Sequence, residues 1–168
     1  MKLVKNTGSD RVINIIRPLI HSGHHLDILS PTISLFAFNE IQQEVQELEG
    51  CRLVLSKNSP DLELLGTEAD RPNRNRLQTR WLANQLLKWI VNKAEIRRSM
   101  SPIPQGTFVI RSSSGQPVQA LLGSLEFSTD GLGLVPGNPM KLIQVSETPE
   151  ESEMLSQWFD TQWDALST

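Results

Sequence analysis

The chain has 168 residues, of which 38% are hydrophobic and 21% charged, a balance typical of one folded domain and not of a disordered chain. It contains no apolar run near the roughly 20 residues of a membrane span, no secretory signal over residues 1–6, and one cysteine, Cys51, which excludes an internal disulfide. These features favour a soluble cytoplasmic protein. The net charge of −3 is unevenly distributed: residues 147–168 hold six acidic residues and no Lys or Arg, so 16 basic and 13 acidic residues remain in the body, a net charge of +3.

Hydrophobic spacing predicts alternating helices and strands along the chain. A short edge strand at Leu3–Val4 precedes a helix that Ser9 or Asp10 is placed to cap and that Pro18 should break. The elements expected after it are a strand over 26–29, a helix over 34–48, a strand over 51–55, a loop over 57–75, a helix over 77–94, a strand from Ile96, strands over 107–110 and 118–122 joined by a hairpin, a loop over 127–139 and a strand over 141–145. This order predicts an α/β fold, a mixed β-sheet sandwiched by helices.

The last segment, residues 148–168, predicts a C-terminal helix. Thr148 is placed to cap it, Pro149 stands at the first helical position, and Glu151 completes a capping box. An apolar stripe follows on one side, formed by Leu155, Phe159, Trp163 and Leu166. Because no Gly or Pro ends this helix, we expect residues 1–147 to form the α/β domain and residues 148–168 to lead toward a downstream domain.

Three histidines, His21, His24 and His25, gather at the end of the first predicted helix, and Asp27 is the nearest acid. A metal site needs three or four convergent ligands, whereas histidines also suit the negative end of a helix dipole. We therefore expect a solvated helix end and no metal site. Cys51, at the start of an apolar strand, is interpreted as a core residue.

Basic residues are concentrated over 71–98, which holds eight Lys or Arg and one acid, Glu95. Three of the arginines precede the predicted helix in an irregular stretch, where they can reach phosphates. Arginine beside tryptophan is common on nucleic-acid-binding surfaces, although the competing interpretation is a solvated loop with Trp81 and Trp89 packed in the core. The sequence predicts weak, salt-dependent and non-specific DNA binding, with contacts from Arg71, Arg74, Arg76, Arg80 and Lys88.

The segment 123–132 reads G-S-L-E-F-S-T-D-G-L and follows a predicted strand, hairpin and strand. It resembles the phospholipase D (HKD) superfamily, in particular the phospholipase D-like domain at the N-terminus of Swi/Snf-type superfamily II helicases and of some restriction-type nucleases. The motif in that family is H-x-K on a strand, a hairpin, then G-S-x-N-F-T-x-x-G-L. The positions that match are Gly123, Ser124, Phe127, Gly131 and Leu132. The layout of the whole chain is similar, and Trp158-Phe159 and Trp163 resemble the lead into a helicase motor.

The catalytic residues of that family are replaced in this sequence. There the histidine is the nucleophile that attacks phosphorus, and the lysine holds the phosphate oxygens. Here H-x-K reads Gln105-Gly106-Thr107, the downstream aspartate falls on Ser112, and the asparagine falls on Glu126. An amide cannot attack as imidazole does, a hydroxyl carries no positive charge, and a glutamate repels phosphate. The resemblance thus implies the fold and argues against the activity, with degenerate motif positions Gln105, Thr107, Ser112, Gly123, Ser124 and Glu126.

Together these observations predict a catalytically degenerate phospholipase D-like half-domain, an accessory part of a helicase or restriction-type DNA-processing protein. Its expected partners are DNA, a downstream helicase domain or a second copy, with no membrane, and no cofactor is implied because the sequence has no P-loop. Two alternatives stay open. One is an active nuclease that works as a homodimer, which would need a histidine at the site; the other is a protein-interaction module with no nucleic-acid role.

Overall fold

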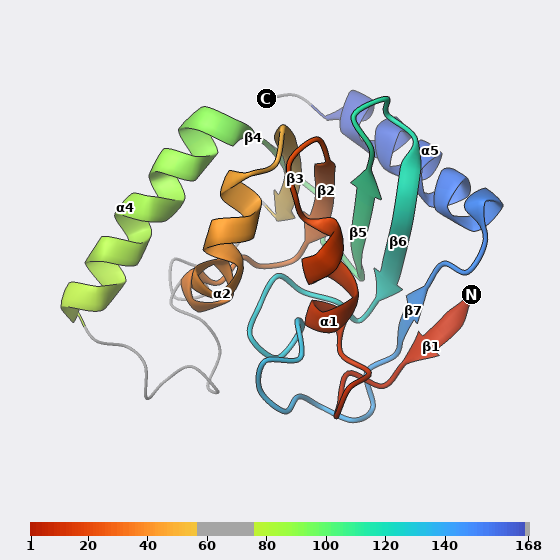
Figure 1. Cartoon of the computed structure of the whole chain (residues 1–168), viewed down its shortest axis with the longest axis horizontal. Helices are drawn as coiled ribbons and strands as arrows, with labels where there is room; N and C mark the ends of the chain where they lie inside the picture. The colour runs from red at the N-terminus through yellow and green to blue at the C-terminus, as the bar shows by residue number, and fades with distance from the viewer. Residues whose placement is uncertain (57–75, 167–168) are drawn as a thin grey trace.

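The computed structural model describes residues 1–56 and 76–166, and the side chains of residues 76–79 lie outside that description. In this part of the chain a seven-stranded mixed sheet has the order β1-β7-β6-β5-β2-β3-β4 (Figure 1). The strands are β1 (Lys2–Val4), β2 (His25–Ser30), β3 (Gly50–Ser56), β4 (Ala94–Ser99), β5 (Gly106–Arg111), β6 (Pro117–Gly123) and β7 (Ile143–Val145). The helices are α1 (Val12–Ile16), the 3-10 turn η1 (Arg17–Leu19), α2 (Leu35–Gln46), α4 (Arg76–Lys93) and α5 (Pro149–Ala165). The predicted α/β fold is confirmed.

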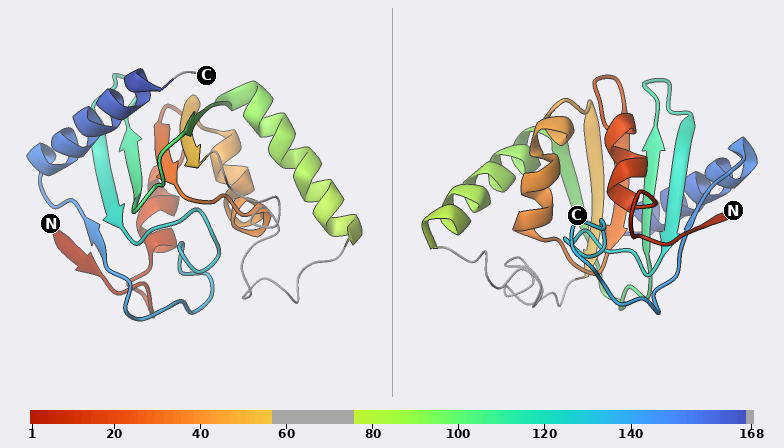
Figure 2. Two further views of the ribbon diagram at one scale, coloured as in Figure 1. Left: turned by 180° about the vertical axis from the view of Figure 1, so that it is seen from behind. Right: turned by 60° about the horizontal axis from the view of Figure 1, so that its bottom comes forward.

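Strand direction follows from how the strands are connected. β2, β3 and β4 are parallel, because α2 links β2 to β3 and the next connection, which contains α4, links β3 to β4. β5 pairs antiparallel with β2, and β5, β6, β7 and β1 continue as antiparallel neighbours. Helices α1, α2 and α4 cover one face of the sheet and α5 covers the other (Figures 1 and 2). None of the described helices is long and apolar enough to cross a membrane.

The two faces of the sheet carry separate apolar cores, since alternate side chains of a strand point to opposite sides. On the face of α1, α2 and α4, strand residues such as Leu26, Ile28 and Leu53 are fully buried. On the face of α5 the core is smaller and is formed by Leu29, Val54, Phe159 and Trp163. The helix α5 is therefore held by few apolar contacts, and polar contacts supply the rest.

The first helix is interrupted where the sequence indicated. α1 gives way to the 3-10 turn η1, and Pro18 stands within that turn, so the expected break is confirmed. The imidazole Nδ1 of His24 lies 2.7 Å from the carbonyl oxygen of Leu19. A histidine thus contacts the end of this helix, as the helix-end interpretation proposed.

The predicted cap of α1 is wrong. The helix begins at Val12, and neither Ser9 nor Asp10 caps it. Asn6 performs this role from further away: its side-chain oxygen accepts a hydrogen bond from the Val12 amide at 3.0 Å. The Asn6 amide nitrogen also donates to the carbonyls of the 130–131 segment at 3.1 and 3.0 Å. One side chain therefore fixes both the helix start and a distant loop, a pairing that local sequence signals do not encode.

The start of α5 follows its sequence signal closely. Thr148 accepts a hydrogen bond from the Glu151 amide at 3.2 Å, and Pro149 is the first helical residue, so both predictions are confirmed. The apolar stripe packs on the sheet, with Phe159 fully buried and Trp163 nearly so. A continuation of residues 148–168 toward a downstream domain stays a prediction.

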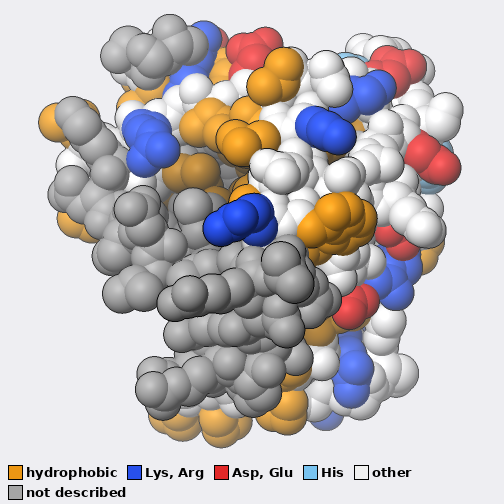
Figure 3. Space-filling view, turned by 90° about the vertical axis from the view of Figure 1, so that its left-hand side faces the viewer, with side chains coloured by type: hydrophobic (Ala, Val, Ile, Leu, Met, Phe, Trp, Pro, Cys, Tyr) orange, Lys and Arg blue, Asp and Glu red, His pale blue; other side chains and the backbone are white. Residues whose placement is uncertain are grey.

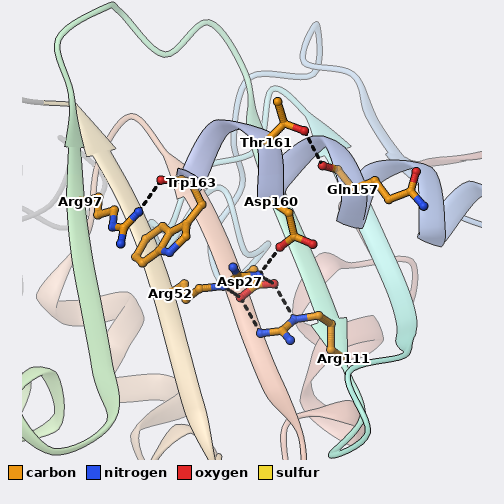
Figure 4. Close-up of polar contacts among 8 residues, drawn as sticks. All are labelled: Asp27, Arg52, Arg97, Arg111, Gln157, Asp160, Thr161 and Trp163. Atoms are coloured by element: carbon orange, nitrogen blue, oxygen red, sulfur yellow. Dashed lines mark hydrogen bonds and ion pairs between the residues drawn. The ribbon is translucent and has the colours of Figure 1, made fainter. Parts of the chain in front are cut away.

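A buried carboxylate lies where β2, β3, β5 and α5 meet (Figure 4). Asp27 is 0% exposed, and its carboxylate accepts two hydrogen bonds from each of two guanidinium groups. Arg52 contributes bonds of 2.8 and 2.8 Å from β3, and Arg111 contributes bonds of 2.7 and 3.2 Å from β5. Arg52 also donates to Asp160 of α5 at 2.7 Å. This four-residue cluster joins three strands to the helix above them.

Two guanidinium groups, those of Arg52 and Arg97, contact the aromatic rings of α5. Arg52 lies 5.0 Å from the centroid of the Phe159 ring, and Arg97 lies 4.4 Å from that of Trp163, distances typical of cation–π pairs. Desolvation opposes the charge on Arg52, but its hydrogen bonds to Asp27 and Asp160 outweigh this and raise its pKa. Arg97 donates to the Trp163 carbonyl at 2.6 Å. This bond satisfies a carbonyl group in the last turn of α5, a helix that no Gly or Pro ends.

We expect Asp27→Asn to lower the free energy of unfolding by about 3 kcal/mol, because the partly buried Arg111 loses its carboxylate partner and Arg52 keeps only Asp160. Urea denaturation followed by circular dichroism measures this loss. The control is Asp164→Asn, an exposed position of α5, which should change stability by less than about 0.5 kcal/mol. Equal stability of the two variants would contradict a central role for the cluster.

Candidate nucleic-acid interface

The glycines of the G-S segment are required by close backbone contacts. Gly123 has a φ of +132°, and a Cβ atom there would clash with the carbonyl oxygen of Leu142. At Gly131 a Cβ atom would clash with the backbone of Glu126. Both positions of the motif are therefore fixed by the path of the chain rather than by chemistry on a substrate.

The other matches in this segment are mostly structural too. Phe127 and Leu132 are 0% exposed and belong to the larger core. The hydroxyl of Ser128 donates to Asp130 at 2.8 Å and accepts from the Gly131 amide at 3.0 Å, which closes the turn. The sequence thus retains what builds this loop, and this explains how the motif can persist without its catalytic residues.

The residues that replace the histidine and lysine of the phospholipase D motif face an apolar pocket. Gln105 and Thr107 line a pocket of about 490 Å³ under α5, together with apolar side chains such as Leu122 and Trp158. None of its described lining residues is Lys, Arg or His. The cation there is the N-terminal ammonium group, and its hydrogen bond to the Glu151 carboxylate, 2.6 Å long, lowers the pKa of Glu151. A phosphate would find no unpaired cation among these residues.

The remaining motif positions do not converge on that pocket. Gly106 pairs with Gly123 across β5 and β6, so the Cα atoms of Gln105 and Ser124 are at most about 13 Å apart. The exposed Ser124 nevertheless lines a different pocket, beside residues 130–131. Ser112 lies in the hairpin beyond Arg111, at the opposite end of β5. The structure brings these backbones together, as expected, but it separates the side chains.

Helix α4 presents an exposed basic face. Its sequence contains four Lys or Arg and no acid. Arg80 and Lys88 are exposed, and neither has an ion-pair partner among the residues that the structure describes. In Figure 3, which faces this side of the molecule, basic and apolar side chains are intermixed, and acidic ones are visible at the top and on the right. The face can therefore attract an anionic partner.

The opposite side of α4 anchors the helix on the core. Leu82 and Leu86 are buried, and the Trp89 indole donates to the Val45 carbonyl of α2 at 3.1 Å. Gln42 of α2 also donates to Gln85 at 3.1 Å. These contacts determine which side of α4 faces solvent.

Two acidic residues of α2, the helix that packs against α4, form ion pairs with Arg17. Arg17 lies 3.2 Å from Glu44 and 3.9 Å from Glu40, so the two carboxylates share one cationic partner.

The residues predicted to contact DNA are only partly visible. Arg71 and Arg74 lie outside the described residues, and Arg76 begins α4 with a side chain that is not described. Arg80 and Lys88 are both exposed on this helix. The competing interpretation of the tryptophans is confirmed for Trp89 and wrong for Trp81, whose side chain is 54% exposed. The spacing of apolar residues did not reveal this, because it does not show which of them a neighbouring element covers.

The histidines do not form a metal site in the described part of the chain, where no group of three or more possible ligands converges. His25 lies 3.4 Å from Glu49, and the rings of His21 and His24 are in contact, tilted by 40° with centroids 3.8 Å apart. Cys51 is buried, as predicted, and its burial raises the pKa of the thiol. A neutral buried thiol is a poor nucleophile.

Comparison with known proteins gives a fold but no family. The sequence matches no protein-family model and no curated protein. TrmBL2, an archaeal chromatin protein with a novel mode of DNA binding, matches with a TM-score of 0.52 at 11% identity, over 99% of this chain and 52% of that one. At this identity the likeness shows a shared fold alone, and this chain spans about half the length of that protein.

Two structures of yeast tyrosyl-DNA phosphodiesterase also match, at 15% identity. Their TM-scores are 0.48 and 0.46, over 87% and 79% of this chain and 31% and 27% of theirs. A TM-score below 0.5 does not establish a common fold.

We expect Gly131→Ala to destabilise the protein by more than 1 kcal/mol, because the new methyl group meets backbone that cannot move aside. Thermal unfolding measures the effect. Gly137→Ala is the matched control, since a Cβ atom there meets only ordinary contacts in the same loop, and it should leave the melting temperature nearly unchanged. Equal melting temperatures would show that the segment relaxes around the substitution.

Proposed function

We propose that this chain is a catalytically degenerate phospholipase D-like domain that binds DNA without cleaving it. The observation that carries the proposal is the outer face of α4, where Arg80 and Lys88 stand exposed on a helix without a single acid. Cations arranged in this way contact phosphates with little sequence preference, and binding weakens with salt through counterion release.

Two further observations support nucleic acid as the anionic partner. TrmBL2, whose fold the chain shares, is described as an archaeal chromatin protein that binds DNA. The acid-rich helix α5 lies on the other face of the sheet from α4, so its charges are kept away from the basic surface (Figure 1).

The absence of cleavage is inferred from the motif positions. Gln105 supplies no nucleophile, Thr107 supplies no charge, and the pocket that they line is mainly apolar. The nuclease alternative gains no support, because His25 pairs in register with Arg111, at the far end of β5 from Gln105. That separation is about 20 Å along the strand.

The wider context rests on the sequence resemblance. On that basis the domain is an accessory part of a helicase or restriction-type DNA-processing protein, and its partners are DNA and a downstream motor domain. Association with a second copy is the alternative for the same surface, and the binding experiments below also test it.

We expect the protein to bind a labelled duplex weakly at low salt, with a log-log salt slope of roughly −3 to −4. In the double variant Arg80→Ala with Lys88→Ala the slope should be less steep by about 2, because each phosphate contact contributes about 0.9 to its magnitude. Fluorescence anisotropy at several salt concentrations measures both values.

The control is Lys2→Ala with Lys5→Ala, which removes the same charge at β1, the other edge of the sheet. It should leave the slope unchanged. A parent that does not bind at low salt, or a double variant with the parental slope, would favour the interaction-module alternative. The same assay on a triple alanine variant tests the predicted contribution of Arg71, Arg74 and Arg76.

We expect no hydrolysis of a generic nitrophenyl phosphodiester above the buffer rate, since no nucleophile and cation meet at the motif positions. Gln105→Ala should behave as the parent does. Turnover by the parent that disappears in Gln105→Ala would show that this site is catalytic, whereas turnover that survives would indicate a different site.

A further inference from the structure

Trp81 is an exception among the tryptophans of the chain. Its side chain is 54% exposed, while Trp89 and Trp163 are only 2% and 5% exposed and Trp158 packs partly against the smaller core. Keeping a large aromatic ring in water forgoes the stabilisation that burial would give. Helix α4 is anchored on the core through its other side, so its packing does not require a tryptophan at position 81.

The surroundings of Trp81 are cationic and apolar together. Lys88 follows seven residues later, two helical turns along the same side and about 10 Å away along the axis. Arg80 is adjacent in sequence and exposed. Leu87 and Val91 are exposed further along the same helix, on the side of Arg80, with 58% and 80% of their side chains accessible. Trp81 and Lys88 thus share one side of a helix that has no acid to repel a phosphate.

We infer that this face takes single-stranded nucleic acid, with an unpaired base stacked on Trp81 and the flanking phosphates held by Arg80 and Lys88. The inference rests on the proposed function and narrows its substrate class. In a duplex the bases are stacked on one another, so a side chain on a helix surface cannot reach their faces. An unpaired base exposes its face, and stacking on an aromatic side chain is how strand-binding proteins hold it.

The composition of the face favours a nucleic acid over a protein partner. Lysine is depleted in the buried centre of protein–protein interfaces, yet Lys88 shares the side of the helix that carries Trp81. A phosphate backbone needs such a cation near each stacked base. The apolar neighbours Leu87 and Val91 add surface against a sugar or a second base without adding charge.

The experiment compares the affinities of a labelled thymidine oligonucleotide and a duplex of equal length at one low salt concentration. We expect the parent to prefer the single strand. Trp81→Ala should weaken single-strand binding about tenfold, the typical effect of losing one stacked base, and should change duplex binding less than twofold. Trp81→Phe should retain most of the single-strand affinity, because it keeps an aromatic face.

Leu87→Ala is the matched control, since it removes a similarly exposed apolar side chain from the same helix but no ring. It should weaken single-strand binding much less than Trp81→Ala. Intrinsic fluorescence of the parent should also be quenched on addition of the single strand, and that part of the quenching should be absent in Trp81→Ala.

Several outcomes would overturn the inference. Unchanged single-strand affinity in Trp81→Ala, or an equal loss for the duplex, would show that the ring does not stack on a base. If Arg80→Ala with Lys88→Ala weakens both ligands while Trp81→Ala weakens neither, the inference fails and the proposed function stands. A parent that binds neither ligand fails both. A parent dimer that Trp81→Ala converts to a monomer in sedimentation would assign this face to a second copy.

Discussion

A fully buried carboxylate within the sheet constrains much of this fold. Asp27 requires cationic partners there, because a buried and unpaired charge costs far more free energy than nearby apolar contacts return. Arg52 and Arg111 meet that demand from the two neighbouring strands. Arg52 then reaches Asp160, so the position of α5 over the sheet depends on the same charge. A shift in the register of either strand would break these bonds.

This constraint separates the two sides of the sheet by role. The side of α5 uses its arginines internally, since Arg52, Arg97 and Arg111 all bind groups of the protein itself. On the side of α4 the exposed Arg80 and Lys88 have no ion-pair partner among the described residues, and α4 is anchored through apolar residues and the Trp89 indole. The acidic C-terminal segment would oppose an anionic ligand if it shared a face with α4. The fold places it behind the sheet.

The resemblance to the phospholipase D superfamily gains a physical explanation from the loop that carries it. Gly123 and Gly131 stand where a side chain would collide with backbone, and Phe127 fills the core. These requirements come from the chain's own path and do not depend on any substrate. Gln105 and Thr107 carry no such requirement, so the catalytic residues can be absent from a sequence that still builds the loop.

The sequence by itself determined the elements whose signals are local. Pro18 breaks a helix through its own ring, Thr148 caps α5 within three residues, and the apolar periodicity of α4 places Trp89 in the core. Only the tertiary structure decided the contacts between distant segments: Asn6 as the partner of α1, Arg97 at the end of α5, and the grip of two arginines on Asp27. Trp81 belongs with these, because its spacing fits a buried position equally well, and what exposes it is the side of α4 that α2 leaves uncovered. Periodicity identifies the apolar residues of a helix, whereas the neighbouring elements decide which of them are covered.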